Sequence, residues 1–280
     1  MAALEQQALS APRPESRLGR VRRRFQSLLL WMQLTRNLAV RDVETRYKHS
    51  LLGLYWAIIN PLVTAGIFSF LFGVIFHTKT GTIPYVVFLL TGLTFWNFFA
   101  NGIMSATSCI TGSAGLLAKL YFPRVVLPTA SVFARLVDLI FSLIVLVVFI
   151  LLYRVPIEWT ALWIIPLLAV QVVFTMGVAY LFASLNVLYR DMTQLVGLLL
   201  MVWMYLSPVM YAASTLSPGL QGVLLMNPMG GMIQAERDLL FVGHITDVPY
   251  LWSAFAWSAF AFVAGLSVFK RIEPLFAEVM

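Results

Sequence analysis

The chain has 280 residues, of which 60% are hydrophobic and only 11% are charged, and its formal net charge is +7. A soluble domain carries about 25% charged residues, so a chain with so few cannot cover a water-exposed surface, and a soluble enzyme is excluded. Disorder is excluded as well, because it requires low hydrophobicity with high net charge, and an all-α polytopic membrane protein remains.

The N-terminal part is basic. Residues 1–27 hold six arginines but lack the apolar core and small-residue cleavage site of a signal peptide, and we expect a disordered cytoplasmic tail. Residues 28–50 place apolar and polar side chains on opposite sides at steps of three and four, which predicts an amphipathic helix. A basic amphipathic helix before a first span usually lies in the membrane interface.

Six stretches are long and apolar enough to cross a bilayer, which takes roughly 20 residues each. They lie at about 51–76, 85–110, 125–153, 161–188, 193–211 and 249–269. We therefore expect one membrane domain over residues 51–273 and a cytoplasmic tail at 274–280.

Prolines and glycines interrupt the segment between the fifth and sixth spans, and its apolar pieces are too short to cross. Two short re-entrant helices within 212–243 would fit, since irregular backbone at membrane depth is tolerated only against protein or water. An ordinary loop outside the membrane is the alternative. The charged cluster of this segment is Glu236, Arg237 and Asp238, which a solvated turn would explain.

The basic residues indicate the orientation in the membrane. Fifteen of the 19 lysines and arginines lie before the first span, between spans two and three or four and five, or after span six. The opposite side carries Lys79, Arg154 and Arg237. Because basic residues concentrate in cytoplasmic loops, both termini are expected in the cytoplasm.

Polar side chains share faces within the predicted spans. Asn97 and Asn101 lie on one side of the second span, and Arg135 and Asp138 on one side of the third. We interpret Arg135 and Asp138 as a structural i,i+3 pair that neutralises itself. Hydrogen bonding between helices accounts for any single polar stripe, and a water-lined path is the functional alternative.

Catalytic motifs are missing from the sequence. It contains no phosphate-binding loop of the form G-x-x-x-x-G-K-[ST], and neither HExxH nor GxSxG. The three histidines are scattered without ligand spacing, so no metal site is expected. We expect a protein that is not an enzyme, and any ATP hydrolysis that drives it must occur in another chain.

Short motifs in a fixed order carry a resemblance to a known family. They are Arg41–Gly53 leading into Trp56 and Asn60-Pro61, then Gly92-Leu93, Phe122-Pro123-Arg124, Asn186 with Tyr189-Arg190-Asp191, Ser207-Pro208, Asn227-Pro228 and Glu273-Pro274. Over roughly residues 35–276 the chain resembles the type-2 ABC-exporter permeases for polysaccharides, which include O-antigen, teichoic-acid and capsule exporters. The element at Asn186 resembles the O-antigen and teichoic-acid branch more than the capsule branch.

The resemblance implies a homodimeric permease of the cytoplasmic (inner) membrane that exports an undecaprenyl-linked polysaccharide. Two copies of a separate ABC ATPase would bind ATP and Mg, while this chain would bind no cofactor and no nucleic acid. A permease for a drug or small lipid is the first alternative. An integral membrane lipid-modifying enzyme is the second.

The resemblance also assigns candidate residues. The loop at 112–124 would couple to the ATPase through Lys119, Tyr121, Phe122, Pro123 and Arg124, and the segment at 212–243 would form gate helices. Spans one, two and five would line the transport pathway at the dimer axis, with Tyr55, Trp56, Asn60, Asn97, Asn101, Trp203, Tyr205 and Tyr211. Independently of the resemblance, Arg41 and Arg46 lie near the expected cytoplasmic surface, where they would meet the lipid pyrophosphate, with anionic lipid headgroups as the alternative. Arg46 interrupts the apolar face of its helix and therefore needs a partner.

Overall fold

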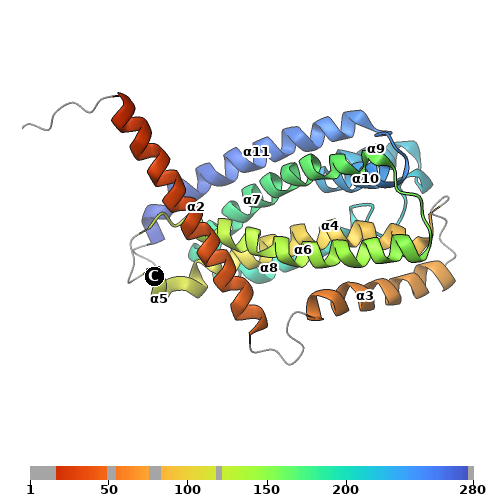
Figure 1. Cartoon of the computed structure of the whole chain (residues 1–280), viewed down its shortest axis with the longest axis horizontal. Coiled ribbons are helices and arrows are strands. Elements are labelled where there is room, and N and C mark those ends of the chain that lie inside the picture. The colour runs from red at the N-terminus through yellow and green to blue at the C-terminus, as the bar shows by residue number, and fades with distance from the viewer. Residues whose placement is uncertain (1–16, 49–54, 76–82, 118–121, 277–280) are drawn as a thin grey trace, which may run out of the picture.

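The computed structural model describes residues 17–48, 55–75, 83–117 and 122–276, and the regular structure in these residues is helical, as predicted. The longer helices are α2 (Arg17–Tyr47), α3 (Trp56–Phe68), α4 (Tyr85–Cys109), α6 (Val126–Leu152), α7 (Ile164–Leu188), α8 (Met192–Tyr205), α10 (Pro228–Phe241) and α11 (Val248–Ile272) (Figure 1). Shorter pieces are α5 (Ala114–Leu117) and α9 (Pro218–Met226), and α3 continues into a π-helical stretch, Ser69–Ile75.

Four helices are long and apolar enough to cross a membrane: α4, α6, α7 with the turn before it, and α11. They coincide with the second, third, fourth and sixth predicted spans. The first and fifth predicted spans correspond to the shorter helices α3 and α8. The 14 residues of α8 extend only about 21 Å, against a hydrocarbon core of roughly 30 Å. Length and composition therefore support four of the six predicted spans.

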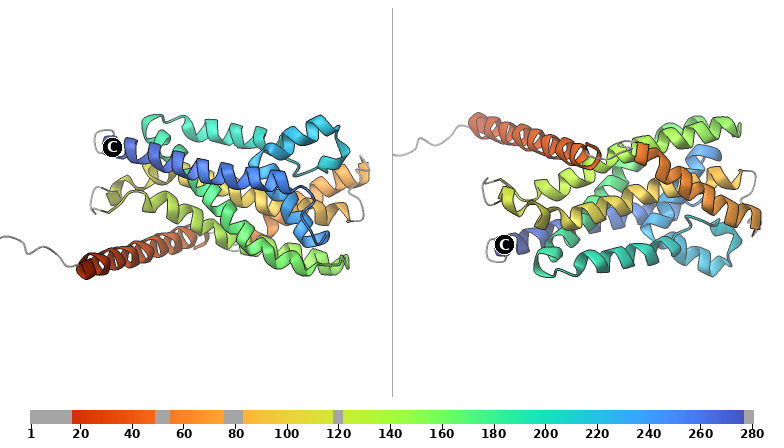
Figure 2. Two further views of the ribbon diagram at one scale, coloured as in Figure 1. Left: turned by 90° about the horizontal axis from the view of Figure 1, so that it is seen from above. Right: turned by 90° about the horizontal axis from the view of Figure 1, so that it is seen from below.

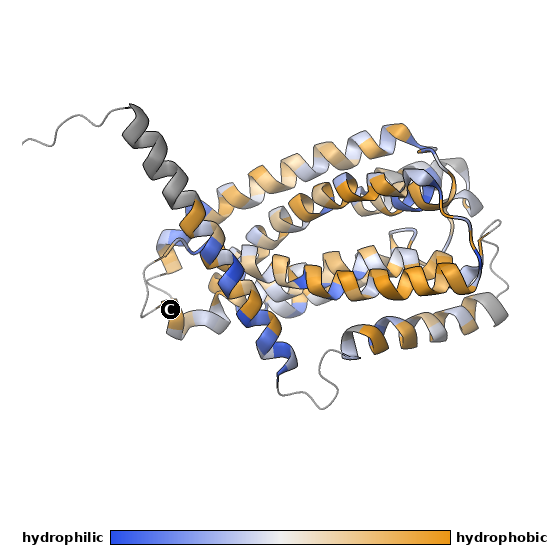
Figure 3. Ribbon diagram, viewed as in Figure 1, coloured by the Kyte–Doolittle hydropathy of each residue, from blue (hydrophilic) through white to orange (hydrophobic). Residues whose placement is uncertain are grey.

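Helix α4 lies at the centre of the bundle. In its apolar window 78% of the residues are buried, against 17–33% in the other three long apolar helices. Its Phe99 ring stacks on Phe174 of α7 at 5.4 Å and meets the edge of Trp203 of α8 at 5.1 Å. Large apolar side chains of α6 and α11 are exposed, among them Ile144, Val148, Trp257 and Val263, as is typical of helices that contact lipid. Figure 3 shows hydrophobic residues along most of α6.

Helices α7 and α11 run side by side (Figure 1) and cross at glycines. A Cβ atom on Gly265 would lie 1.9 Å from the carbonyl oxygen of Gly177, and one on Gly177 would lie 2.4 Å from the backbone of Ala261. Small residues allow helix backbones in a membrane to approach closely. Neither glycine was among the predicted site residues or motifs.

The segment after α8 forms the two short helices α9 and α10, at the place where two short helices were predicted. Asn227, between them, accepts a hydrogen bond from the indole of Trp203 at 2.7 Å and donates one to the Ser207 hydroxyl at 2.8 Å. These bonds fasten the short helices to the end of α8.

The interpretation of Glu236, Arg237 and Asp238 as a solvated turn is wrong. Their exposed fractions are 0%, 3% and 2%, and all three lie inside α10. Arg237 donates to the carbonyl oxygens of Pro208 and Val209 at 2.6 and 2.7 Å. These carbonyls belong to a buried non-helical turn, whose backbone must find donors in the protein, and a long buried guanidinium supplies them.

Helix α2 crosses the end of the bundle that carries the C-terminus (Figures 1 and 2) and packs against α6. Leu38 of α2 is buried with Val126 and Leu127 of α6. The helix begins at Arg17, eleven residues before the predicted start, in a stretch whose many arginines are good helix formers. The outer part of the predicted tail, residues 1–16, lies outside the described residues.

Candidate functional site

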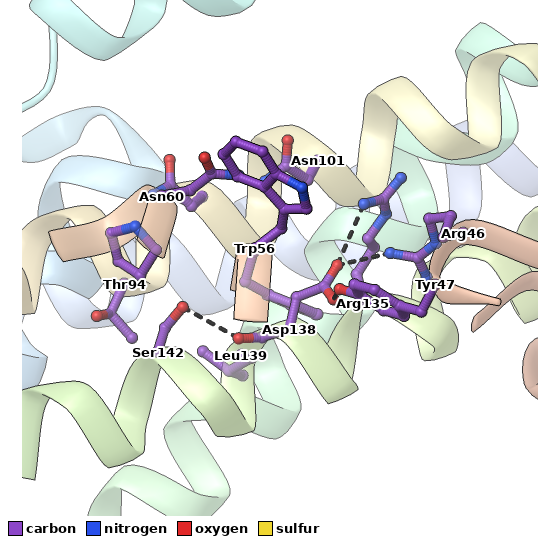
Figure 4. A pocket seen from close by; sticks show the side chains of 13 residues that line it. Arg46, Tyr47, Trp56, Asn60, Thr94, Asn101, Arg135, Asp138, Leu139 and Ser142 are labelled. Atoms are coloured by element: carbon purple, nitrogen blue, oxygen red, sulfur yellow. Dashed lines mark hydrogen bonds and ion pairs between the residues drawn. The ribbon is translucent and has the colours of Figure 1, made fainter. Parts of the chain in front are cut away.

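A polar cavity of about 370 Å³ opens between α2, α3, α4 and α6 (Figure 4). Four of the eight predicted pathway residues line it: Trp56 and Asn60 from α3, and Asn97 and Asn101 from α4. The two residues of each pair are four positions apart, so each pair lies on one face of its helix. The structure thus brings the polar faces of the first and second predicted spans to one place.

Asp138 of α6 is the centre of a charged cluster at one end of this cavity. Its Oδ2 accepts from Arg46 of α2 at 2.7 Å and from Arg135 at 3.1 Å, and its Oδ1 accepts from the Tyr47 hydroxyl. Burial, together with the hydrogen bond to Asp138, raises the pKa of Tyr47 to about 12. The phenol therefore stays protonated at neutral pH and remains a donor.

The predicted i,i+3 pair of Arg135 and Asp138 is present, but it is not self-contained. Arg46 of α2 donates a hydrogen bond to the same carboxylate from a position 92 residues away in the sequence. It also contacts Asp42 at 3.3 Å. Tyr47, which was not among the predicted site residues, joins the cluster because it follows Arg46 at the end of α2.

A second cavity of about 470 Å³ lies further along α2, toward the end of the bundle that carries α5. It is lined by Arg41 and Asp42 of α2, Ser105 and Ser108 of α4, and Ser131 of α6. On each of the three helices the nearest of these residues lies about one turn from the lining of the first cavity, and Ser108 lies one turn further along α4. The two cavities together line α2 with polar groups. This polar surface extends from the loop after α4, at one end, to Asp138 in the middle of α6, at the other.

The other predicted pathway residues lie elsewhere. Tyr55 is 68% exposed and precedes α3, and Tyr205 is 56% exposed on α8. Tyr211 donates to the carbonyl oxygen of Tyr205 at 3.0 Å, while Trp203 is held by Phe99 and Asn227. Trp203 also lines an apolar groove beside α8 and α9. This second group is aromatic and does not contribute to the polar cavity.

The predicted coupling residues are only partly described, since Lys119 and Tyr121 lie outside the described residues. Pro123 is exposed and Phe122 is half-buried. Arg124 is engaged within the chain, because its guanidinium donates to the Glu273 carbonyl at 2.8 Å and lies 5.6 Å from the Phe276 ring. The C-terminal segment and the loop before α6 therefore form one surface.

We expect Arg124→Ala to loosen this surface. The variant removes a charge-assisted hydrogen bond, and we expect a loss of about 1.5–3 kcal/mol of stability together with faster amide exchange in residues 270–276. Hydrogen exchange of the purified protein measures both effects. Lys270→Ala, at an exposed position of the same surface, is the control, and equal exchange in the two variants would contradict the role of Arg124.

No metal centre is formed within the described residues, where no group of three or more His, Cys, Asp or Glu side chains converges. The polar cavity instead offers guanidinium, amide, hydroxyl and indole groups. Guanidinium groups bind anions, and amide and hydroxyl groups form hydrogen bonds with sugar hydroxyls. The one carboxylate of the described lining, that of Asp138, is already bound by two guanidiniums.

The sequence matches the ABC-2 type transporter family over residues 33–241. It is 33% identical to the O-antigen export system permease protein RfbA of Klebsiella pneumoniae, over 86% of this chain and 92% of that protein. It is 28% identical to the protein of the same name from Myxococcus xanthus, over 86% and 93%. The polysialic acid transport protein KpsM of Escherichia coli is 24% identical, over 84% and 92%.

Proposed function

The chain belongs to the ABC-2 type transporter family, and we propose that it is the permease subunit of an ATP-driven exporter that moves a lipid-linked polysaccharide across the cytoplasmic membrane. The family match confirms the resemblance inferred from the motifs. The observation that carries the proposal is the similarity to O-antigen export permeases over 86% of the chain. Identities of 28–33% to O-antigen permeases, against 24% to a polysialic acid transport protein and 22% to a capsule polysaccharide export protein, support a substrate of the O-antigen type.

The transporter would be a homodimer with two separate ATPase subunits, which bind ATP and Mg. A single bundle of this size does not enclose a path wide enough for sugars, and a second copy would complete it. In that dimer α3 and α8 act as the first and fifth spans. The apolar side chains that they expose, such as Ile67 and Leu198, support burial against another copy or lipid.

Both termini would lie in the cytoplasm. The positive-inside distribution supports this orientation, and so does the position of α2, α5 and the C-terminus at one end of the bundle (Figure 1). The surface that joins Arg124 to Glu273 would then face the ATPase, together with Lys119, Tyr121, Phe122 and Pro123. Helices α9 and α10, at the opposite end, would act as re-entrant gate helices.

Transport would begin at the polar cavity. Asn60, Asn97 and Asn101 would form hydrogen bonds with sugar hydroxyls, and Trp56 would stack on a sugar ring. Tyr55 and the aromatic group of Trp203, Tyr205 and Tyr211 would continue the path along the dimer axis. Contacts of this kind are weak and repeated, which a moving chain requires. Arg41, in the second cavity, would contact the lipid headgroup at the membrane surface.

We expect Asn101→Trp to block this path, because the indole would fill the cavity. Surface polysaccharide of a strain that relies on this permease should fall about tenfold, which corresponds to roughly 1.4 kcal/mol in the limiting step. Immunoblots of surface polysaccharide measure export, and membrane protein levels show whether the variant folds.

Ile144→Trp provides the matched control, because Ile144 is 51% exposed on α6 outside the cavity. Normal export by a folded Asn101→Trp variant would remove the cavity from the path. Failure of the wild-type chain to co-purify with any ATPase would contradict the proposed function itself.

A further inference from the structure

We propose that Arg135, together with Arg46, binds the phosphate group of the membrane-anchored substrate in the polar cavity, and that Asp138 occupies their donors while the site is empty. This inference rests on the proposed function and names the chemistry that the cavity recognises. It gives Arg135 and Asp138 roles beyond those of a structural ion pair.

The donors around Asp138 are those that a phosphate requires. Two guanidiniums and one phenol converge on its two carboxylate oxygens, from α2 and from α6 itself. Guanidinium groups match phosphate oxygens in geometry and bind them through charge-assisted hydrogen bonds. The Asp138 carboxylate already collects these donors, and a phosphate could accept the same charge-assisted hydrogen bonds in its place.

The positive and negative charges of the cluster around Asp138 are not matched one to one. One carboxylate serves both guanidiniums, and Arg46 has a second partner in Asp42 at 3.3 Å. Arg135 contacts Asp138 through one nitrogen, and its Nε is buried without a hydrogen-bond partner among the described residues. Arg135 is therefore the cation of the cluster with unused donor capacity.

The position of Arg135 also indicates a function. It lies nine residues after the first residue of α6, about 14 Å along the helix. An arginine at this depth in an apolar span is costly and is conventionally read as part of a transport path. A merely structural pair would need no cavity beside it, whereas this pair lines one of about 370 Å³.

The cavity has two ends of different chemistry. Figure 4 shows Arg46, Tyr47 and Arg135 gathered on one side of Asp138, while Asn60 and Thr94 lie at the opposite end. The Thr94 hydroxyl is buried and has no partner among the described residues, so the far end also offers an unused polar group. A substrate would place its phosphate toward α2 and its first sugar toward Asn60.

Binding to the complete transporter tests the inference. The wild-type permease and its ATPase, in nanodiscs of neutral phosphatidylcholine, are titrated with radiolabelled farnesyl pyrophosphate. We expect Arg135→Gln to weaken binding about tenfold, since it removes a charge-assisted contact. Asp138→Asn should strengthen binding several-fold, because it removes the competing anion and keeps the shape. Arg154→Gln, at an exposed site outside the cavity, should change nothing.

Further probes identify the source of the phosphate. Inorganic pyrophosphate that competes as well as the farnesyl compound would indicate a site for free phosphate, and competition by phosphatidylglycerol would indicate ordinary anionic lipid. Either result overturns the assignment to the substrate. Farnesol, which has the chain without the charge, should not compete.

Arg135→Lys is the control for folding, because it keeps the positive charge but loses the planar guanidinium. It should bind farnesyl pyrophosphate less tightly than wild type and more tightly than Arg135→Gln. If Asp138→Asn does not fold, the comparison of wild type, Arg135→Lys and Arg135→Gln tests the inference by itself. Wild-type affinity in both folded Arg135 variants overturns the inference while export by the wild-type chain still supports the proposed function. Absence of export by the wild-type chain would instead count against the function.

Discussion

Replacement of Arg237 by methionine should strongly destabilise the protein. The guanidinium is 3% exposed, donates to the carbonyls of Pro208, Val209 and Phe88 at 2.6–3.2 Å, and lies 3.5 Å from the Phe88 ring. Methionine keeps an apolar stem but leaves the turn carbonyls without a donor. Since each unsatisfied buried group costs about 1–3 kcal/mol, a loss on the order of 3–5 kcal/mol is expected.

The melting temperature and the monodispersity of the detergent-purified protein measure this loss. Arg237→Lys should recover only part of the stability, because a single ammonium cannot reach three carbonyls as a planar fork does. The control is Arg190→Met, at an exposed position. A melting temperature of Arg237→Met equal to that of the control would show that the buried turn does not depend on this side chain.

Gly265→Leu is expected to separate α7 from α11. The first atom of the new side chain would lie 1.9 Å from the carbonyl oxygen of Gly177, and backbone cannot move aside as a flexible side chain does. Overpacking in a tight core costs about 1–3 kcal/mol, and a backbone clash between two long helices should reach or exceed the upper value. We expect little protein in the membrane fraction and no export.

Gly265→Ala should show the same defect in a milder form, since the clash begins at Cβ. Gly66→Ala is the matched control: a Cβ at Gly66, in α3, would have no heavy atom within 4 Å, and alanine favours a helix over glycine by roughly 0.5–1 kcal/mol. A Gly265→Ala protein as stable as Gly66→Ala would mean that α7 and α11 can move apart without loss.

These two predictions concern contacts that hold the cavity in place without lining it. Arg237 joins α10 to α4 and to the turn after α8, and the glycines join α7 to α11. Helix α4, which supplies Asn97 and Asn101, packs against both α7 and α10. Loss of either contact should therefore reduce export through loss of folded protein rather than through a change in substrate binding.

The sequence by itself determined the class of the protein and the positions of its helices. Helix α4 ends at Cys109, and α6 covers Val126–Leu152, each within one residue of the predicted bounds, because the length of an apolar run sets the length of a spanning helix. Prolines and glycines located the short helices α9 and α10. The order of short motifs was sufficient to identify the family.

Part of the site was also predictable. The helical period places Asn97 with Asn101, and Arg135 with Asp138, on common faces, so the sequence predicted which residues act together within a helix. The sequence did not predict which helix faces pack against one another. The contact of Arg46 with Asp138 joins residues 92 positions apart, and no local pattern relates them.

Only the tertiary structure decided the environment of the charged residues. Arg237 lies between two acidic residues, a sequence that fits a solvated turn. In the structure it is buried, because the carbonyl groups of the turn after α8 accept its hydrogen bonds. Trp203 and Trp56 were both predicted to line the pathway, yet Trp203 packs against core rings beside an apolar groove, whereas Trp56 lines the polar cavity. The physical reason is common to these cases: periodicity is a property of a single helix, whereas burial and pairing depend on the neighbours that packing supplies.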